Sequence, residues 1–190
     1  MPRPGDAMDL EQLREAIASG DPSRAMPALA GLREVPAEQA EPLLLLGLEQ
    51  SAFMVRSLSC AGLGVKPTPA GWEALVKALQ HDDDANVRAE AANALVSHSL
   101  ERAWPLLLAA FERDTQWLLR CSVLSAVAEH PAMAAADLLQ LARLALEDAD
   151  GTVRVGAAEI LGRVVGQAAQ DPEPAAKARA LLVQLQQDPD

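Results

Sequence analysis

The chain has 190 residues and a hydrophobic share of 50%, but only 3% of its residues are aromatic and tyrosine is absent. This share of apolar residues is enough to build the core of one ordinary domain, which excludes a largely disordered chain. The formal net charge of −11 excludes nucleic acid as a partner, because an acidic surface and a phosphate backbone repel each other.

The predicted elements are all α-helices, because apolar residues recur at helical spacing and no alternating strand pattern is present. Residues 1–8 are expected to be a disordered N-terminal segment, and residues 9–187 to form a single domain. Proline and glycine fall where helices must end, as at Gly20, at Pro36 and in the segment 66–69. In chain order, the helices are expected at residues 9–18, 23–33, 38–49, 53–64, 70–80, 84–97, 101–112, 116–129, 132–146, 151–166 and 173–186.

An aliphatic residue followed by arginine recurs along the chain at a nearly constant period. Arg56, Arg88 and Arg120 follow one another at intervals of 32 residues, and Arg154 comes 34 residues later. A weaker copy at Arg24 lies 32 residues before Arg56. A fixed period of this length is the signature of a solenoid, in which each repeat packs on its neighbours.

The surroundings of these arginines repeat as well. Residues 82–96 and 148–162 share an acidic turn, Val-Arg, a pair of alanines and a closing Leu. Asp84 and Asp150 each stand three residues before the valine, where an aspartate side chain can cap the first turn of a helix. An apolar helix precedes each turn, so the repeating unit is predicted to be helix, turn, helix.

The period, the acidic turn and the string of Val-Arg, alanines and Leu resemble HEAT repeats of the short type found in phycobilin lyases. The resemblance covers nearly the whole chain. It implies a right-handed α-solenoid of about five helix pairs, closed by a C-terminal capping helix. Similar repeats occur in phycobilin lyase subunits, phycobilisome-degradation factors, protein-modifying enzymes and plain scaffolds, so the resemblance specifies the fold and leaves the function open.

The repeated arginines are predicted to be structural. On the helix that begins near Val87, the alanines and leucines cluster around the direction of that valine and mark the core face, and Arg88 lies beside it, about 100° away. Its stem is expected to pack between repeats while its guanidinium reaches an acidic turn, as the resemblance to HEAT proteins implies. A ligand-binding row of arginines is the alternative. The residues of this predicted ladder are Arg56, Asp84, Arg88, Arg120, Asp150 and Arg154.

The opposite side of the second helix of each pair is predicted to line a concave surface, which HEAT-like arrays use to bind partners. In the third repeat this side carries Asn93, flanked by Ala89 and Ser97. Small, mildly polar side chains let a helix or loop approach closely, but they supply few acids, bases or nucleophiles. The predicted partner-binding residues are Ser57, Ala89, Asn93, Ser97, Cys121, Ser125, Glu129, Glu159 and Arg163.

Tryptophan, histidine and cysteine are the remaining residue types that could form a site. Trp117 stands at a turn before a second helix and is predicted to be an exposed aromatic anchor for a partner. The three histidines fall near helix ends and none is followed by glutamate, so no metal site is expected. Cys60 and Cys121 are predicted to lie far apart, and no catalytic residue or cofactor is expected.

The cellular setting is predicted from what the sequence lacks. Two cysteines without a CxxC spacing favour a reducing compartment. The start of the chain has no signal-peptide pattern, and no run of about 18 apolar residues is present. We therefore expect a cytoplasmic protein that does not insert into membranes.

The leading hypothesis is a non-catalytic scaffold or adaptor that binds a protein partner along its concave face. The alternative is a phycobilin lyase-like subunit or a phycobilisome-associated assembly or degradation factor, with a phycobiliprotein or a bilin as its partner. An open-chain tetrapyrrole is best held by aromatic walls with a carboxylate or histidine near its nitrogens. With two Phe, three Trp and no Tyr, the chain departs from that pattern.

Overall fold

The fold was obtained as a computed structural model, which describes residues 9–128 and 130–187. These residues form α-helices and one short 3-10 helix, with no strand among them, which confirms the predicted all-α class. The elements are α1 (Leu10–Ala18), α2 (Pro22–Gly31), η1 (Leu32–Glu34), α3 (Ala37–Leu48), α4 (Phe53–Val65), α5 (Pro69–His81), α6 (Ala85–His98), α7 (Leu100–Arg113), α8 (Trp117–Ala128), α9 (Ala135–Leu146), α10 (Gly151–Gly166) and α11 (Pro172–Gln187). The segment expected to be disordered, 1–8, and the predicted site residue Glu129 lie outside the described residues.

The helix boundaries agree with the predicted ones to within about two residues, except at α9. That helix was expected from residue 132 but begins at Ala135. Pro131 and the next residue form a turn, and Met133 then places its side chain in the core with 4% of its surface exposed. Helix-forming alanines around it misled the prediction, because propensity alone does not show which side chain must be buried.

Aspartate caps begin several helices, as the sequence predicts. Asp84 Oδ1 accepts a hydrogen bond from the Asn86 backbone N at 2.8 Å, and Asp150 Oδ1 accepts one from the Thr152 backbone N, also at 2.8 Å. Each cap satisfies an amide that has no partner within its own helix. The caps therefore fix where the second helices α6 and α10 start.

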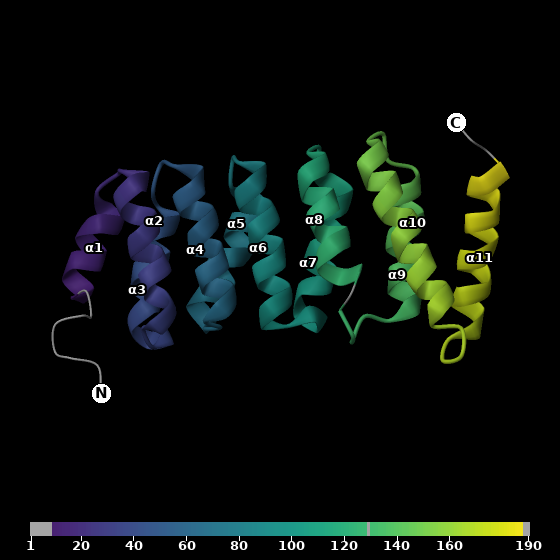
Figure 1. Ribbon diagram of the computed structural model, residues 1–190, viewed down its shortest axis with the longest axis horizontal. Coiled ribbons are helices and arrows are strands. Elements are labelled where there is room, and N and C mark those ends of the chain that lie inside the picture. The colour runs from purple at the N-terminus through teal and green to yellow at the C-terminus, as the bar shows by residue number, and fades with distance from the viewer. Residues whose placement is uncertain (1–8, 129, 188–190) are drawn as a thin grey trace. The chain divides into compact units, whose positions relative to one another are not determined.

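The chain divides into two compact units, with unit 1 ending at Ser99 and unit 2 beginning at Leu100. In unit 1 the helices pair in chain order, α1 with α2, α3 with α4 and α5 with α6, and the second helices α2, α4 and α6 lie side by side (Figure 1). This stacking of sequence-adjacent pairs is the arrangement of an α-solenoid. Continuity of one domain over residues 9–187 stays a prediction.

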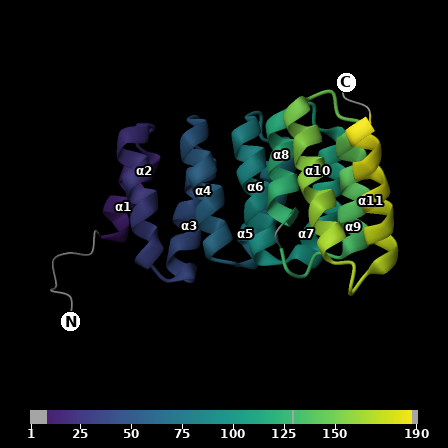
Figure 2. The same cartoon turned by 45° about the vertical axis from the view of Figure 1, so that its right-hand side comes forward.

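Unit 2 follows the same plan. Its second helices α8 and α10 are neighbours, and α10 is flanked by α9 and α11 (Figure 2). The last helix, α11, buries Ala175 and Ala178 while Val183 and Leu185 are exposed. None of the described helices combines the length and the apolar character that a membrane span requires.

Candidate functional site

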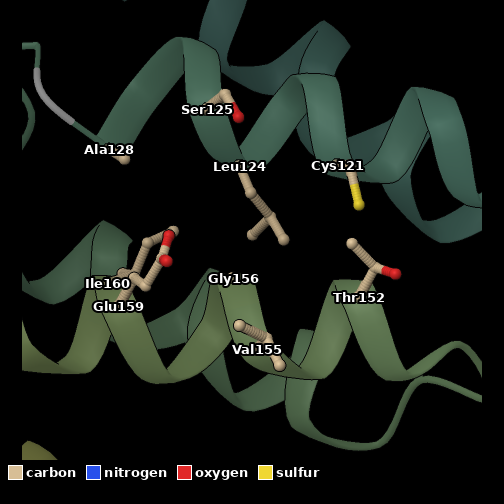
Figure 3. A pocket seen from close by; sticks show the side chains of 9 residues that line it. All are labelled: Cys121, Leu124, Ser125, Ala128, Thr152, Val155, Gly156, Glu159 and Ile160. Carbon is tan, nitrogen blue, oxygen red and sulfur yellow. The ribbon is translucent and has the colours of Figure 1, made fainter.

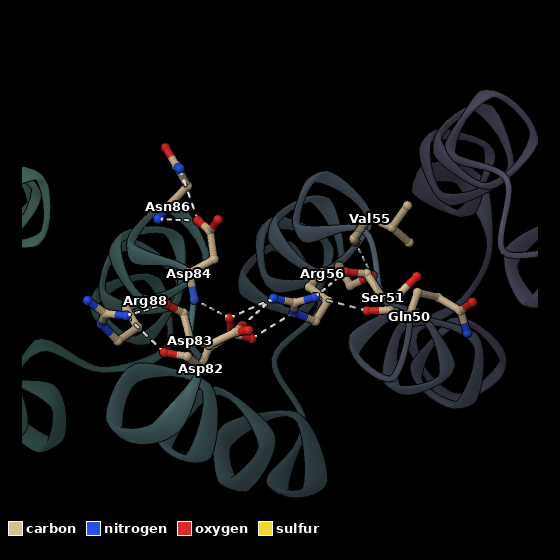
Figure 4. Close-up of polar contacts among 10 residues, drawn as sticks. Gln50, Ser51, Val55, Arg56, Asp82, Asp83, Asp84, Asn86 and Arg88 are labelled. Atoms are coloured by element: carbon tan, nitrogen blue, oxygen red, sulfur yellow. Dashed lines mark hydrogen bonds and ion pairs between the residues drawn. The ribbon is translucent and has the colours of Figure 1, made fainter.

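In unit 1 the repeat arginine joins one helix pair to the next. Arg56 on α4 donates from Nε to Asp82 Oδ2 at 2.8 Å and from Nη2 to Asp82 Oδ1 at 3.0 Å (Figure 4). Its Nη1 donates to the carbonyl oxygen of Ser51 at 2.7 Å. The side chains of Arg56 and Asp82 are only 12% and 11% exposed. This paired, hydrogen-bonded geometry favours the structural role predicted for Arg56.

Unit 2 repeats this arrangement. Arg120 on α8 donates from Nε to Asp148 Oδ2 at 2.5 Å, from Nη2 to Asp148 Oδ1 at 2.9 Å, and from Nη1 to the Asp114 carbonyl at 2.8 Å. Burial alone would raise the pKa of the Asp148 carboxyl, but the hydrogen bonds from Arg120 and from the Asp150 backbone, with the positive charges of Arg120 and Arg154, together outweigh it, so the pKa lies below its ordinary value. The same balance lowers the pKa of Asp82 beside Arg56.

The carboxylates of this ladder differ from the predicted ones. The ladder was expected to use Asp84 and Asp150, but the ion pairs form two residues earlier, at Asp82 and Asp148. The predicted aspartates are committed to capping α6 and α10. Their oxygens point at the first turn of the helix, so the carboxylate at the start of the turn is the one that faces the preceding arginine.

The other two ladder arginines hold the turns that precede them. Arg88 Nη1 donates to the Asp82 carbonyl at 2.9 Å (Figure 4), and Arg154 Nη1 donates to the Asp148 carbonyl at 2.8 Å. Both bonds tie the second helix to the loop that enters it. These contacts favour the structural interpretation of the arginine row over the ligand-binding one.

A second set of side chains that contact backbone carbonyl oxygens lies at the far ends of the second helices. Arg163 on α10 donates to the carbonyl oxygens of Val127 at 3.0 Å and His130 at 2.7 Å, and so caps the end of α8. In unit 1, His98 Nε2 lies 2.8 Å from the Leu63 carbonyl near the end of α4. Arg163 was predicted to bind a partner, but its guanidinium is already engaged in holding two neighbouring helices together.

A groove opens between α8 and α10 in unit 2, with a volume of about 460 Å³. It brings together three of the predicted partner-binding residues, Cys121, Ser125 and Glu159. Figure 3 shows the Leu124 side chain pointing from α8 into the middle of this space. The lining of this α8/α10 groove consists of Cys121, Leu124, Ser125, Ala128, Thr152, Val155, Gly156, Glu159 and Ile160.

The groove exists because of the sizes of the residues that face each other across it. A β-carbon placed on Gly156 would lie 2.9 Å from the Leu124 Cδ1 atom, so α10 accepts the leucine against its bare backbone. One turn farther along, Ala128 and Ile160 face each other at the same end of the groove (Figure 3). This bulkier pair keeps the two helices apart and leaves space on either side of the leucine.

The predicted partner-binding residues of unit 1 are less accessible as a group. Ala89 is buried with 6% of its surface exposed, whereas Ser57 and Asn93 are half-buried. Ser97 is exposed, and its hydroxyl donates to the Asn93 carbonyl at 3.3 Å. The binding role of these four residues stays a prediction.

The electrostatics of the α8/α10 groove suit binding better than catalysis. Burial raises the pKa of the Cys121 thiol, and the negative charges of Asp150 and Asp148 raise it further, so the nucleophilic thiolate is disfavoured. Glu159 is the one carboxylate among the described lining residues, which include no Lys, Arg or His. Across the described ranges, no three His, Cys, Asp or Glu side chains gather in a way that would hold a metal ion.

Part of the groove and one exposed aromatic residue were not predicted from the sequence. Thr152 and Ile160 line the groove, although they stand beside the predicted columns rather than in them. Trp117 is 46% exposed at the first residue of α8, as predicted, but Phe53 occupies the equivalent first position of α4 and is 40% exposed. The equal distance of Phe53 and Trp117 from their repeat arginines was the available signal.

Comparison with known proteins identifies the repeat type. Residues 40–128 match the family model of HEAT repeats, so the helix pairs of that segment are similar to HEAT repeats. The match runs from Ala40, in the first turn of α3, to Ala128 at the end of α8. A search of characterised proteins found no match to the chain.

Proposed function

We propose that this protein is a non-catalytic HEAT-repeat adaptor that holds a segment of a partner protein in the α8/α10 groove. The observation that carries the proposal is the groove itself, which gathers Cys121, Ser125 and Glu159 around a space of about 460 Å³. HEAT-type arrays offer extended surfaces for protein partners without a reaction centre. A groove of this volume accommodates side chains of a docked segment.

The character of the lining supports a protein partner. Val155 supplies exposed aliphatic surface above the buried Leu124 and Ile160, while Ser125 and Thr152 supply exposed hydroxyl groups. An apolar centre with a polar rim is the usual composition of a protein interface. The small side chains around Leu124 allow a partner backbone to approach closely.

A comparative pull-down tests the proposal. Ser125→Arg and Val155→Asp change exposed residues of the groove, so both variants should fold normally. Gln140→Arg, at an exposed position on α9, is the matched control. We expect at least one partner to be retained by the wild type and by the control but lost with both groove variants, and to bind as a purified protein with the same preference. Equal retention by all four proteins would contradict the proposal.

That the repeats are of the phycobilin-lyase-like type, and that the protein acts at the phycobilisome, both stay predictions. No aromatic residue lines the α8/α10 groove, so no observation there favours a bilin. Mixing the protein with phycocyanobilin and recording the visible absorption and circular dichroism tests this alternative directly. An induced chiral signal would support bilin binding, and an unchanged spectrum would remove it. The cytoplasmic location expected from the sequence likewise stays a prediction.

A further inference from the structure

We propose that the α8/α10 groove selects a basic partner segment, one that presents a bulky aliphatic side chain with a lysine or arginine about one helical turn away. This inference rests on the proposed function and adds the chemistry of the partner to it. The occupant is defined by two neighbouring features of α10, an exposed aliphatic side chain and a carboxylate without a partner.

The aliphatic requirement comes from the middle of the groove. Val155 is 60% exposed within α10. Leu124 points toward the same space from α8, and Gly156 adds no side chain between them (Figure 3). An aliphatic side chain placed there would remove the Val155 surface from water and fill the space beside Leu124.

The cationic requirement comes from Glu159. Its side chain is exposed, and no hydrogen bond or ion pair engages its carboxylate within the described part of the chain. The arginine one turn farther along, Arg163, is held by the carbonyl oxygens of Val127 and His130 and is not directed at the glutamate. The Glu159 charge is therefore available to a cation from outside.

The surrounding charges reinforce this preference. Asp150 caps α10 near the Cys121 end of the groove, where its negative charge and that of Asp148 each act on the Cys121 thiol more strongly than the positive charge of Arg120. The whole chain carries a formal charge of −11, which attracts basic segments at a distance and repels acidic ones. The groove thus combines a local carboxylate with a favourable long-range field.

The spacing of the two features sets the spacing in the partner. Val155 and Glu159 are four residues apart on α10, which places them about 6 Å apart along the helix axis. A partner helix matches this distance with an aliphatic residue and a cation three or four positions apart. An extended segment matches it with the two residues at alternate positions.

Selection from a random peptide library tests the inference without a known partner. Phage displaying random 16-residue peptides would be selected on the immobilised wild-type protein, after removal of phage that bind the Ser125→Arg variant. We expect the enriched peptides to share an aliphatic residue and a Lys or Arg at the stated spacing. Synthetic versions of these peptides should slow the alkylation of Cys121, which lines the groove.

Affinity measurements on those peptides then determine how much the Glu159 carboxylate contributes to binding. Glu159→Gln should weaken binding about fivefold, as expected for an exposed ion pair, and should reduce the salt dependence of binding. Glu101→Gln, at an exposed position on α7, is the control and should leave the affinity unchanged. Peptides that depend on the groove but bind Glu159→Gln as well as wild type would overturn this inference and leave the adaptor proposal standing. Failure to recover any groove-dependent peptide would overturn both.

Discussion

Two equivalent helix interfaces, called seams here, are α4 against α6 in unit 1 and α8 against α10 in unit 2. They share the same arginine–aspartate ion pairs and helix caps, called the frame here, but they differ in how closely their two helices pack. Gly64 lets α4 approach Ala94 of α6 so closely that an added β-carbon would lie 2.9 Å from the alanine β-carbon. At the same two positions the second seam has Ala128 and Ile160, and its helices pack less closely. A few side-chain carbons therefore separate a closed structural seam from an open groove.

The position that faces the groove shows the same contrast. Where unit 2 has Gly156, unit 1 has Glu90, whose side chain is half-buried between helices. Burial raises the pKa of the Glu90 carboxyl, as expected for a carboxyl that is partly removed from water. The repeat frame is thus conserved between the units while the seam residues decide which one can accept a partner.

The largest expected effect comes from breaking the frame that both seams share. Arg56→Gln and Arg120→Gln each leave a largely buried aspartate without its cation, at a cost of about 3 kcal/mol or more in the free energy of unfolding. Arg154→Gln is the control, because its guanidinium bonds to backbone carbonyls and is exposed, and it should cost about 1 kcal/mol or less. Urea denaturation measures all three.

The stability that Arg56→Gln loses should depend on pH. The pKa of Asp82 is lower in the folded chain than its ordinary value of 3.8. The ion pair with Arg56 therefore stabilises the fold fully above about pH 3.8, and this stabilisation is lost as the pH falls through the lowered pKa of Asp82. The stability difference between wild type and Arg56→Gln should shrink in strong acid to the part that comes from the backbone hydrogen bonds of Arg56. A difference that persists unchanged to low pH would contradict the assignment of the ion pair.

Alanine substitution of the seam glycines sharpens the comparison. Gly64→Ala should cost about 2 kcal/mol by overpacking, because its β-carbon would meet the Ala94 backbone at 3.0 Å. Gly156→Ala meets only the end of the flexible Leu124 side chain, so its effect should stay within about 1 kcal/mol. Gly162→Ala has nothing within 4 Å of the added carbon and should stabilise by up to about 1 kcal/mol. Equal losses at Gly64 and Gly156 would refute the difference between the seams.

The smallest expected effect is a gain in stability at Glu90. Since burial raises its pKa above the ordinary value of 4.5, the folded state binds this proton more tightly than the unfolded state, and stability falls as the pH rises through that range. Glu90→Gln removes the cost of the buried charge and should raise the melting temperature at neutral pH. The gain should disappear below about pH 4. Thermal melts at the two pH values measure it, and a loss of stability at neutral pH would contradict the account.

Sequence reasoning found the frame more readily than the site, for physical reasons. The arginine period and the Asp caps are set locally, so they locate α6 and α10 correctly. The choice of Asp82 over Asp84 depends on which carboxylate faces the preceding repeat, and three adjacent aspartates offer no sign of that in the sequence. The groove could not be predicted from the sequence, because the effects of Gly156 and Ile160 depend on the separation of two helices.

Alkylation of the native protein by a maleimide, with each cysteine followed by mass spectrometry, tests the contrast between the seams most directly. Cys60 lies in the closed seam with none of its surface exposed, and burial, with the charges of Asp82 and Glu90, raises its pKa to about 12. Cys121 is half-buried and lines the open groove. We predict that Cys121 is modified at least about a hundredfold faster than Cys60. Equal rates at the two thiols would contradict the claim that the α4/α6 seam is closed and the α8/α10 seam open.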